Sequence, residues 1–168
     1  LALDGDAFGA WTSAGGDVGG PGIWIAVDCP GLGDPYCTAT ANSTGAPAVL
    51  AADGDPRVTQ NDLDLLCASL PPGKFGYFLM SQTQDFRPLV GGGQGNLCLG
   101  GSIVRFAQDV QMAAPDGTVS FSPDLANLPG GTSIAPGERW SFQFWYRDKP
   151  GGGAGYNLSD GLNVTFTN

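Results

Sequence analysis

The feature that most limits the fold is the way glycine and proline interrupt short apolar runs throughout the chain. The 168 residues include 28 Gly and 13 Pro, and few windows of ten residues are free of both. Both residues are unfavourable inside a helix, whereas between apolar runs they are typical of turns that join strands. The acids are almost all aspartate, which favours turns and caps over helix interiors. The sequence therefore predicts an all-β protein.

The apolar runs alternate with period two, which is typical of strands buried on one face. In "GIWIAVDC", Ile23, Ile25, Val27 and Cys29 fall on one face, opposite Trp24. Further runs of this kind are "AVLAA", "NDLDLLCASL", "FGYFLMS", "SIVRFAQ", "TVSFSPD", "RWSFQFWYR" and "GLNVTFT". Eight or nine strands separated by long Gly/Pro-rich loops predict an antiparallel β-sandwich with a jelly-roll-like arrangement.

The first 22 residues differ in composition from the rest of the chain. Residues 1–22 have few apolar anchors and many glycines, so we expect a flexible arm or edge strand there and a single β-sandwich domain over 23–168. The arm could also add a strand to the sheet of a neighbouring copy. The chain begins at Leu1 rather than Met, as a mature or excised product would.

The charge balance excludes two classes of partner. A net charge of −9 and a pI near 4.1 argue against nucleic acid, because neutralising phosphates needs clustered Lys and Arg. The same charge argues against anionic lipid surfaces. No apolar run approaches the ~18 residues of a membrane span. We therefore expect no nucleic-acid partner and no membrane span.

The cysteines indicate an exported protein. Cys29, Cys37, Cys67 and Cys98 lack the spacing of a zinc site, and histidine is absent. Two disulfides fit better than a metal cluster, and they place the chain outside the cell or at its surface. The sequence alone allows three pairings. Cys29 and Cys67 fall on predicted inward faces and could bridge across the core, which would leave Cys37 for Cys98.

The chain is poorly supplied for catalysis. A Ser–His–Asp or Cys–His arrangement is impossible without histidine. A glycosidase needs two carboxylates flanking a cleft, whereas most aspartates here lie in turn contexts such as "DGD", "GDP" and "PDG". We therefore expect that the protein is not an enzyme.

Calcium is the one metal that the sequence suggests, and no cofactor is required. The candidate ligands are three Asp-x-Asp pairs: Asp4/Asp6, Asp53/Asp55 and Asp62/Asp64. Alternate carboxylates can converge on Ca²⁺ together with backbone carbonyls. None of the pairs matches an EF-hand loop, and hydrated turn acids are the alternative interpretation.

The densest aromatic stretch is "ERWSFQFWYRD", at 138–148. Its alternation places four rings on one face, which we expect to be core: Trp140, Phe142, Phe144 and Tyr146. Trp145 falls on the opposite face, between Gln143 and Arg147.

An outward Trp145 between planar polar side chains is typical of sheets that bind glycans. The ring stacks on the sugar, while the amide of Gln143 and the guanidinium of Arg147 bind hydroxyl or carboxylate groups. The alternative is a tryptophan covered by a loop or by arginine stems. Trp24, together with Trp11 and Tyr156 in Gly-rich segments, could extend such a platform.

From Cys37 onward, an ordered series of motifs resembles a known domain. The motifs are "YCTATANSTGAPAVLAADG", "NDLDLLCASLPPGKFGYFLMSQTQ", "GNLCLGGSIVRF", "PGERWSFQFWYRD" and "NLSDGLNVTF". They are similar to an uncharacterised β domain found near the C-terminus of large exported proteins of planctomycetes, myxobacteria and related marine bacteria. The resemblance covers about residues 36–167. It implies export, an accessory non-catalytic role and a Cys37–Cys98 disulfide, with Cys29 and Cys67 as an extra pair, but it carries no ligand or site residue with it.

Two functions are compatible with these observations. The first is an extracellular binding or attachment domain whose first-choice ligand is a glycan, bound by Trp145, Gln143, Arg147 and Trp24. The second is a structural subunit or spacer of a bacterial surface or extracellular assembly, in which the arm at 1–22 contacts other copies of the protein.

Overall fold

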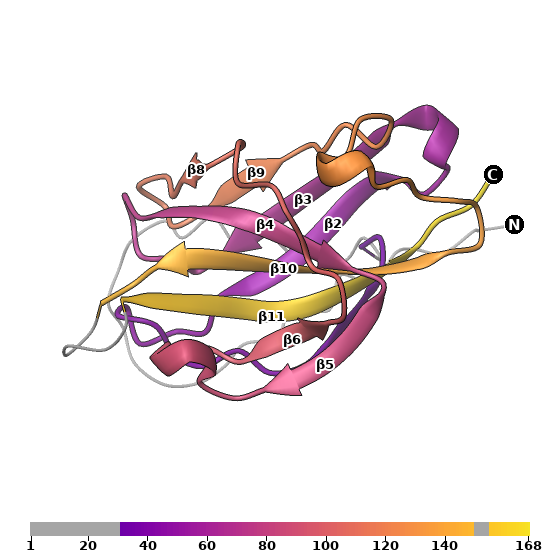
Figure 1. Ribbon diagram of the computed structural model, residues 1–168. Helices are drawn as coiled ribbons and strands as arrows, with labels where there is room; N and C mark the ends of the chain where they lie inside the picture. Colours follow the sequence, from indigo (N-terminus) through magenta and orange to yellow (C-terminus); the bar gives the residue numbers. More distant parts are fainter. Residues whose placement is uncertain (1–30, 150–154) are drawn as a thin grey trace, which may run out of the picture.

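A computed structural model describes residues 31–149 and 155–168, and nearly all of their regular structure is β-strand (Figure 1). The strands are β1 (Asp34–Tyr36), β2 (Val49–Asp55), β3 (Asp62–Ala68), β4 (Phe75–Ser81), β5 (Thr83–Arg87), β6 (Leu97–Gly100), β7 (Val104–Arg105), β8 (Gln111–Met112), β9 (Val119–Phe121), β10 (Arg139–Arg147) and β11 (Tyr156–Thr165). Short 3₁₀ helices are η1 (Val58–Gln60), η2 (Val90–Gly92) and η3 (Pro129–Gly131).

The strands form three antiparallel sheets. The main sheet has the order β1-β11-β10-β4-β7, and β8 also pairs with β4. A three-stranded sheet has the order β2-β3-β9, and β5 and β6 form a two-stranded ribbon. The predicted all-β antiparallel sandwich is confirmed. The described residues hold eleven strands rather than eight or nine, because short pieces such as β1 and β6 lie in Gly-rich segments that resemble loops.

The main core lies between the main sheet and the three-stranded sheet. Alternate residues of β10 point into it, and they are the four rings that the sequence predicted: Trp140, Phe142, Phe144 and Tyr146. From the opposite sheet, β3 contributes Leu63, Leu65 and Cys67. Burying large apolar side chains of this kind is the main favourable term in folding. We call this side of the main sheet its inner face.

A bulge changes which side chains of β11 point to the inner face. Phe142 pairs with Leu162, but Trp145 pairs with Leu158, so β11 carries one extra residue between these points. A one-residue shift sends every following side chain to the other side of the sheet. Leu162 therefore packs in the main core, while Leu158 and Tyr156 pack on the outer face.

Polar contacts of Ser159 and Asp160 hold the bulge in place. The Ser159 hydroxyl accepts a hydrogen bond from the Phe144 N–H, at 2.9 Å. The Asp160 N–H donates to the Ala48 carbonyl, and its carboxylate accepts from the Leu50 N–H at 2.7 Å. The bulge thus ties the main sheet to the edge of β2.

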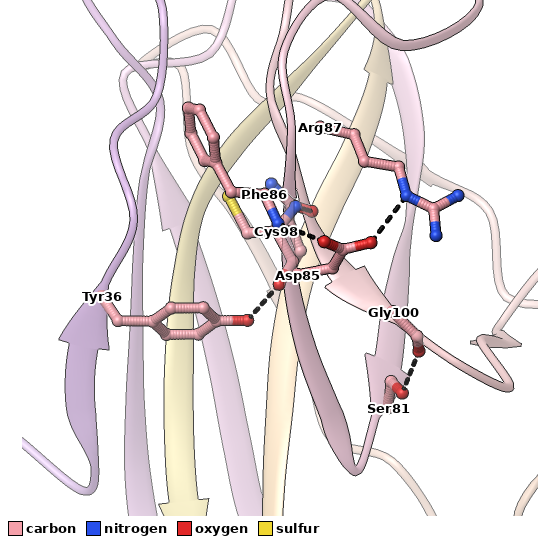
Figure 2. A network of polar contacts seen from close by, with 8 residues as sticks. Tyr36, Ser81, Asp85, Phe86, Arg87, Cys98 and Gly100 are labelled. Carbon is pink, nitrogen blue, oxygen red and sulfur yellow. Dashed lines mark hydrogen bonds and ion pairs between the residues drawn. The ribbon is translucent and has the colours of Figure 1, made fainter.

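The ribbon of β5 and β6 covers part of the outer face of the main sheet, on the side away from β2 and β3 (Figure 1). Under it, Leu99 packs with Leu79 and Leu158 in a second, smaller core. Figure 2 shows two hydrogen bonds that attach the ribbon to the main sheet: Tyr36 donates to the Cys98 carbonyl at 2.8 Å, and Ser81 donates to the Gly100 carbonyl at 2.7 Å.

A disulfide joins Cys37 to Cys98, as the resemblance implied, with Cα atoms 6.3 Å apart. It closes a loop across 61 positions, and a loop of that length stabilises the folded state by on the order of 4 kcal/mol in the chain-entropy model. Cys67 is inward and buried as predicted, and its thiol is free in the structure. Cys29 lies outside the described residues, so the Cys29–Cys67 bridge stays a prediction.

No helix in the described ranges is long and apolar enough to cross a membrane. The predicted arm at 1–22 lies outside those ranges, so its separation from a domain at 23–168 also stays a prediction.

Candidate functional site

The outer face of the main sheet carries a row of three aromatic rings, which we call the aromatic ladder: Tyr77 on β4, Trp145 on β10 and Tyr156 on β11. The Tyr77 and Trp145 ring centroids are 5.0 Å apart with planes at 28°, and those of Trp145 and Tyr156 are 5.6 Å apart at 30°. Because β10 lies between β4 and β11, the two tyrosines flank the indole on opposite sides. Stacking of this kind contributes about 0.5–1.5 kcal/mol per pair beyond the area buried.

The pairing register of the strands explains how β4, β10 and β11 each supply one ring of the ladder. Trp145 pairs directly with Tyr77, so both rings point to the same side. Tyr156 reaches that side only because of the bulge in β11. The sequence indicated Trp145 and Tyr156 as surface aromatics but missed Tyr77. The alternation of Gly76, Tyr77 and Phe78 in "FGYFLMS" is the signal that could have found it.

An open cavity of about 220 Å³ lies beside the ladder. Its lining is mostly apolar, and the residues are Tyr77, Leu79, Val90, Leu97, Ile103, Arg105, Trp145, Tyr156 and Leu158. Leu79 and Leu158 are buried, whereas the ladder rings, Leu97 and Ile103 are half-buried. A concave apolar surface with few polar groups is typical of a small-ligand site.

Two arginines border this region. Arg147 lies over the Trp145 ring, with its guanidinium carbon 5.3 Å from the ring centroid, and Arg105 lines the cavity from β7. Ion pairs in the described part of the chain involve other arginines: Arg57, Arg87 and Arg139. Both bordering arginines are exposed.

The prediction that Gln143 binds ligand beside Trp145 is wrong. Gln143 is 0% exposed, because β6 of the ribbon lies over it. Its amide nitrogen donates to the carbonyls of Asn96 and Ser159 at 2.8 and 2.7 Å, and its oxygen accepts from the Cys98 N–H at 3.0 Å. Gln143 therefore fastens the ribbon to the main sheet and is out of reach of a ligand.

Trp145 is half-buried, and its two faces are covered by the neighbouring rings, so it presents an edge rather than the free face that the sequence suggested. Arg147 is exposed as predicted. Trp24 lies outside the described residues, and its place in the platform stays a prediction.

Two of the three candidate calcium pairs lie opposite each other on the hairpin of β2 and β3. Asp53 pairs with Asp64, and Asp55 pairs with Asp62, so all four carboxylates are on the side of the three-stranded sheet that faces away from the main core. Two of the four contact other side chains: Asp55 forms an ion pair with Arg57, and the Ser122 hydroxyl donates to Asp64. The hydrogen bonds from Arg57 lower the pKa of Asp55 to about 2.

Across residues 31–149 and 155–168, no three His, Cys, Asp or Glu side chains are grouped as metal ligands would be. Asp4 and Asp6 lie outside these ranges. Structural calcium stays a prediction.

Titratable groups are also buried on the inner side of the main sheet, across the sheet from the ladder. Burial raises the pKa of the Cys67 thiol and of the Tyr146 hydroxyl. The Tyr146 hydroxyl and one oxygen of Asp148 are buried without a hydrogen-bond partner. Burial also raises the pKa of Asp160 to about 6, although the hydrogen bond from Leu50 opposes the shift.

The geometry thus brings together an aromatic ladder, an apolar cavity and two exposed arginines on one face. Comparisons with protein-family models, with curated proteins and with solved structures gave no match. The candidate site therefore rests on its geometry.

Proposed function

We propose that this chain is a non-catalytic extracellular binding or attachment domain, and that it binds a glycan at the cavity beside the aromatic ladder. The observation that carries the proposal is the open apolar cavity, bordered by three ordered rings, on a face whose other half is covered by the ribbon. Partly exposed rings gathered around a hollow mark an interaction surface. The Cys37–Cys98 disulfide supports an extracellular location.

The ladder is suited to binding because it is already ordered. Tyr156 donates a hydrogen bond to the Val90 carbonyl, and Trp145 is held between its two neighbours. Little side-chain entropy is therefore lost when a ligand is bound. The C–H face of a sugar would pack against Tyr77 and Ile103 on the cavity wall, and its polar groups would meet the arginines.

Affinity electrophoresis through gels that contain starch, xylan, alginate or polygalacturonate tests the proposal. We expect at least one polysaccharide to retard the protein. Ile103→Asp, which places a charge in the cavity and replaces none of the three ladder rings, should abolish the retardation, as should Trp145→Ala. Phe86→Ala is the matched control, because Phe86 is a ring that is 57% exposed on the ribbon, outside the cavity lining.

Circular dichroism separates loss of binding from loss of fold in each variant. If Trp145→Ala unfolds, Ile103→Asp still decides the result. Absence of retardation on all four polysaccharides, or retardation that Ile103→Asp leaves unchanged, would overturn the proposal.

A second candidate, a subunit of an extracellular assembly, is favoured by a groove at the edge of β2. The groove measures about 240 Å³ and is lined mainly by apolar and glycine residues: Gly31, Leu32, Gly33, Pro35, Leu50, Ala51, Ala52 and Leu162. In the described residues β2 is an edge strand, and isolated hydrogen bonds, such as that from the Leu32 N–H to the Ala52 carbonyl, are made along its free edge. Such an edge accepts an added strand.

The occupant that we propose for the groove is the segment 1–22 of a neighbouring copy, because 30 residues precede Gly31, which itself lines the groove. Light scattering on the full chain should show an oligomer, and deleting 1–22 should disperse it. A full chain that is monomeric at high concentration would overturn this candidate.

A further inference from the structure

The two arginines beside the ladder have no carboxylate to neutralise them in the described residues. Arg147 contacts the Trp145 ring, and Arg105 makes one long hydrogen bond of 3.5 Å, to the Ile103 carbonyl. None of the residues that line the cavity is acidic. This is unusual in a chain with 16 acidic and 7 basic residues.

Sheet register fixes how far apart these arginines are. Arg105 pairs with Leu79 of β4, whereas Arg147 lies beyond the pair of Trp145 with Tyr77. From strand rise and spacing, their Cα atoms are about 16 Å apart, on opposite sides of the ladder. A single small anion would meet one guanidinium, whereas a chain with an acid group on successive units would meet both.

The overall charge of the protein does not prevent such a ligand. Charges beyond about 8 Å are largely screened at physiological ionic strength, so the local guanidinium groups decide the potential within the cavity. Two arginines are too few for a polyphosphate backbone, which needs clustered cations. Guanidinium groups do bind carboxylate and sulfate oxygens through paired hydrogen bonds.

We infer that the ligand of the aromatic cavity is an acidic polysaccharide, with carboxylate or sulfate groups that pair with Arg105 and Arg147 while its sugar rings pack in the cavity. The inference rests on the proposed function and names the class of glycan. It predicts that the charge, and not only the sugar backbone, is required for binding.

Polygalacturonate and its methyl ester provide the direct test, because they share a backbone and differ in charge. By calorimetry with the full chain, we expect polygalacturonate to bind and the ester to bind at least tenfold more weakly. Dextran sulfate compared with dextran is the matching arm for sulfate groups. Arg105→Gln and Arg147→Gln should each weaken binding roughly fivefold, as expected for an exposed charge-assisted contact.

Arg139→Gln is the matched control, because Arg139 is exposed at the other end of β10 and pairs with Asp34 at 3.4 Å. Equal binding of the free acid and the ester, with Ile103→Asp still inactive, would overturn the inference and leave the glycan proposal intact. Binding of polyadenylate as tight as that of polygalacturonate would also overturn it, since any polyanion would then suffice. If no polysaccharide binds, the proposed function fails together with the inference.

Discussion

The two faces of β10 are built in different ways. Toward the three-stranded sheet, the alternate residues of β10 from Trp140 to Tyr146 form a row of four aromatic rings, and contact between side chains holds the two layers together. Toward the outside, Ser141 and Gln143 are buried: Ser141 donates a hydrogen bond to Asn163 of β11, and Gln143 accepts one from the Cys98 N–H of the ribbon. Trp145 is half-buried beside the cavity. The inner face is covered along its length by apolar packing, whereas the outer face is covered only at one end, by polar contacts and by the small core of Leu79, Leu99 and Leu158.

This difference shows where a binding surface can form in a sandwich. An apolar face must be covered along its whole length, because exposing it costs free energy in proportion to area. The outer face is covered only in part, and its uncovered part carries half-buried rings beside an apolar cavity. The candidate site lies where the ribbon ends.

The largest expected effect comes from breaking the inner face. Phe142→Ala removes a ring that is 0% exposed and leaves a cavity in the main core. We expect a loss of about 4 kcal/mol in the free energy of unfolding, measured by urea titration, and faster hydrogen exchange throughout β3, β4 and β10. A loss below about 1 kcal/mol would mean that the inner face is not the main source of stability.

The adjacent residue tests the outer face. Gln143→Leu has a similar volume but leaves the Cys98 N–H and the carbonyls of Asn96 and Ser159 without partners. We expect a loss of about 3 kcal/mol in the free energy of unfolding. Faster exchange should be concentrated in β5 and β6. Uniform exchange across both faces would contradict the view that the two layers are fastened independently.

The smallest effect concerns the bulge, where pH should change stability. The pKa of Asp160 is about 6 in the folded state against an ordinary value of 3.8, so the folded protein binds this proton more tightly than the unfolded chain does. The resulting stabilisation is fully present below about pH 4 and is lost as the pH rises through 6.

Asp160→Asn keeps an oxygen for the Leu50 N–H but cannot ionise. After allowance for solvent screening, we expect the variant to be about 1 kcal/mol more stable than the parent at pH 7.5 and equal to it at pH 4. Thermal melts at both pH values measure the difference. A variant that is less stable at pH 7.5 would show that the carboxylate charge helps to hold β2.

Local patterns predicted part of this molecule and could not predict the rest. Alternation within "RWSFQFWYR" correctly separated Phe142 from Gln143, because side-chain direction depends only on the strand itself. It could not show that β6, more than 40 residues earlier in the chain, covers Gln143. The same limit applies to Tyr77, whose position beside Trp145 follows from the pairing of β4 with β10.

The bulge was hidden for a different reason. The predicted strand "GLNVTFT" begins only after the bulge, and the apolar residues Tyr156, Leu158, Leu162 and Val164 keep one phase in the sequence. The extra residue shows only against the partner strand. The Cys37–Cys98 pairing was one of three that the sequence allowed, and the family resemblance favoured it. Cysteine spacing alone could not choose among them.

The extra residue in β11 also has a consequence for how the protein can change over time. Before the bulge Tyr156 and Leu158 point to the outer face, and after it Leu162 and Val164 point to the main core, although all four hold even-numbered positions of one strand. Substitutions at Tyr156 or Leu158 alter the candidate ligand surface, and substitutions at Leu162 or Val164 alter the core. Ligand preference and foldability can therefore vary separately within a single ten-residue strand.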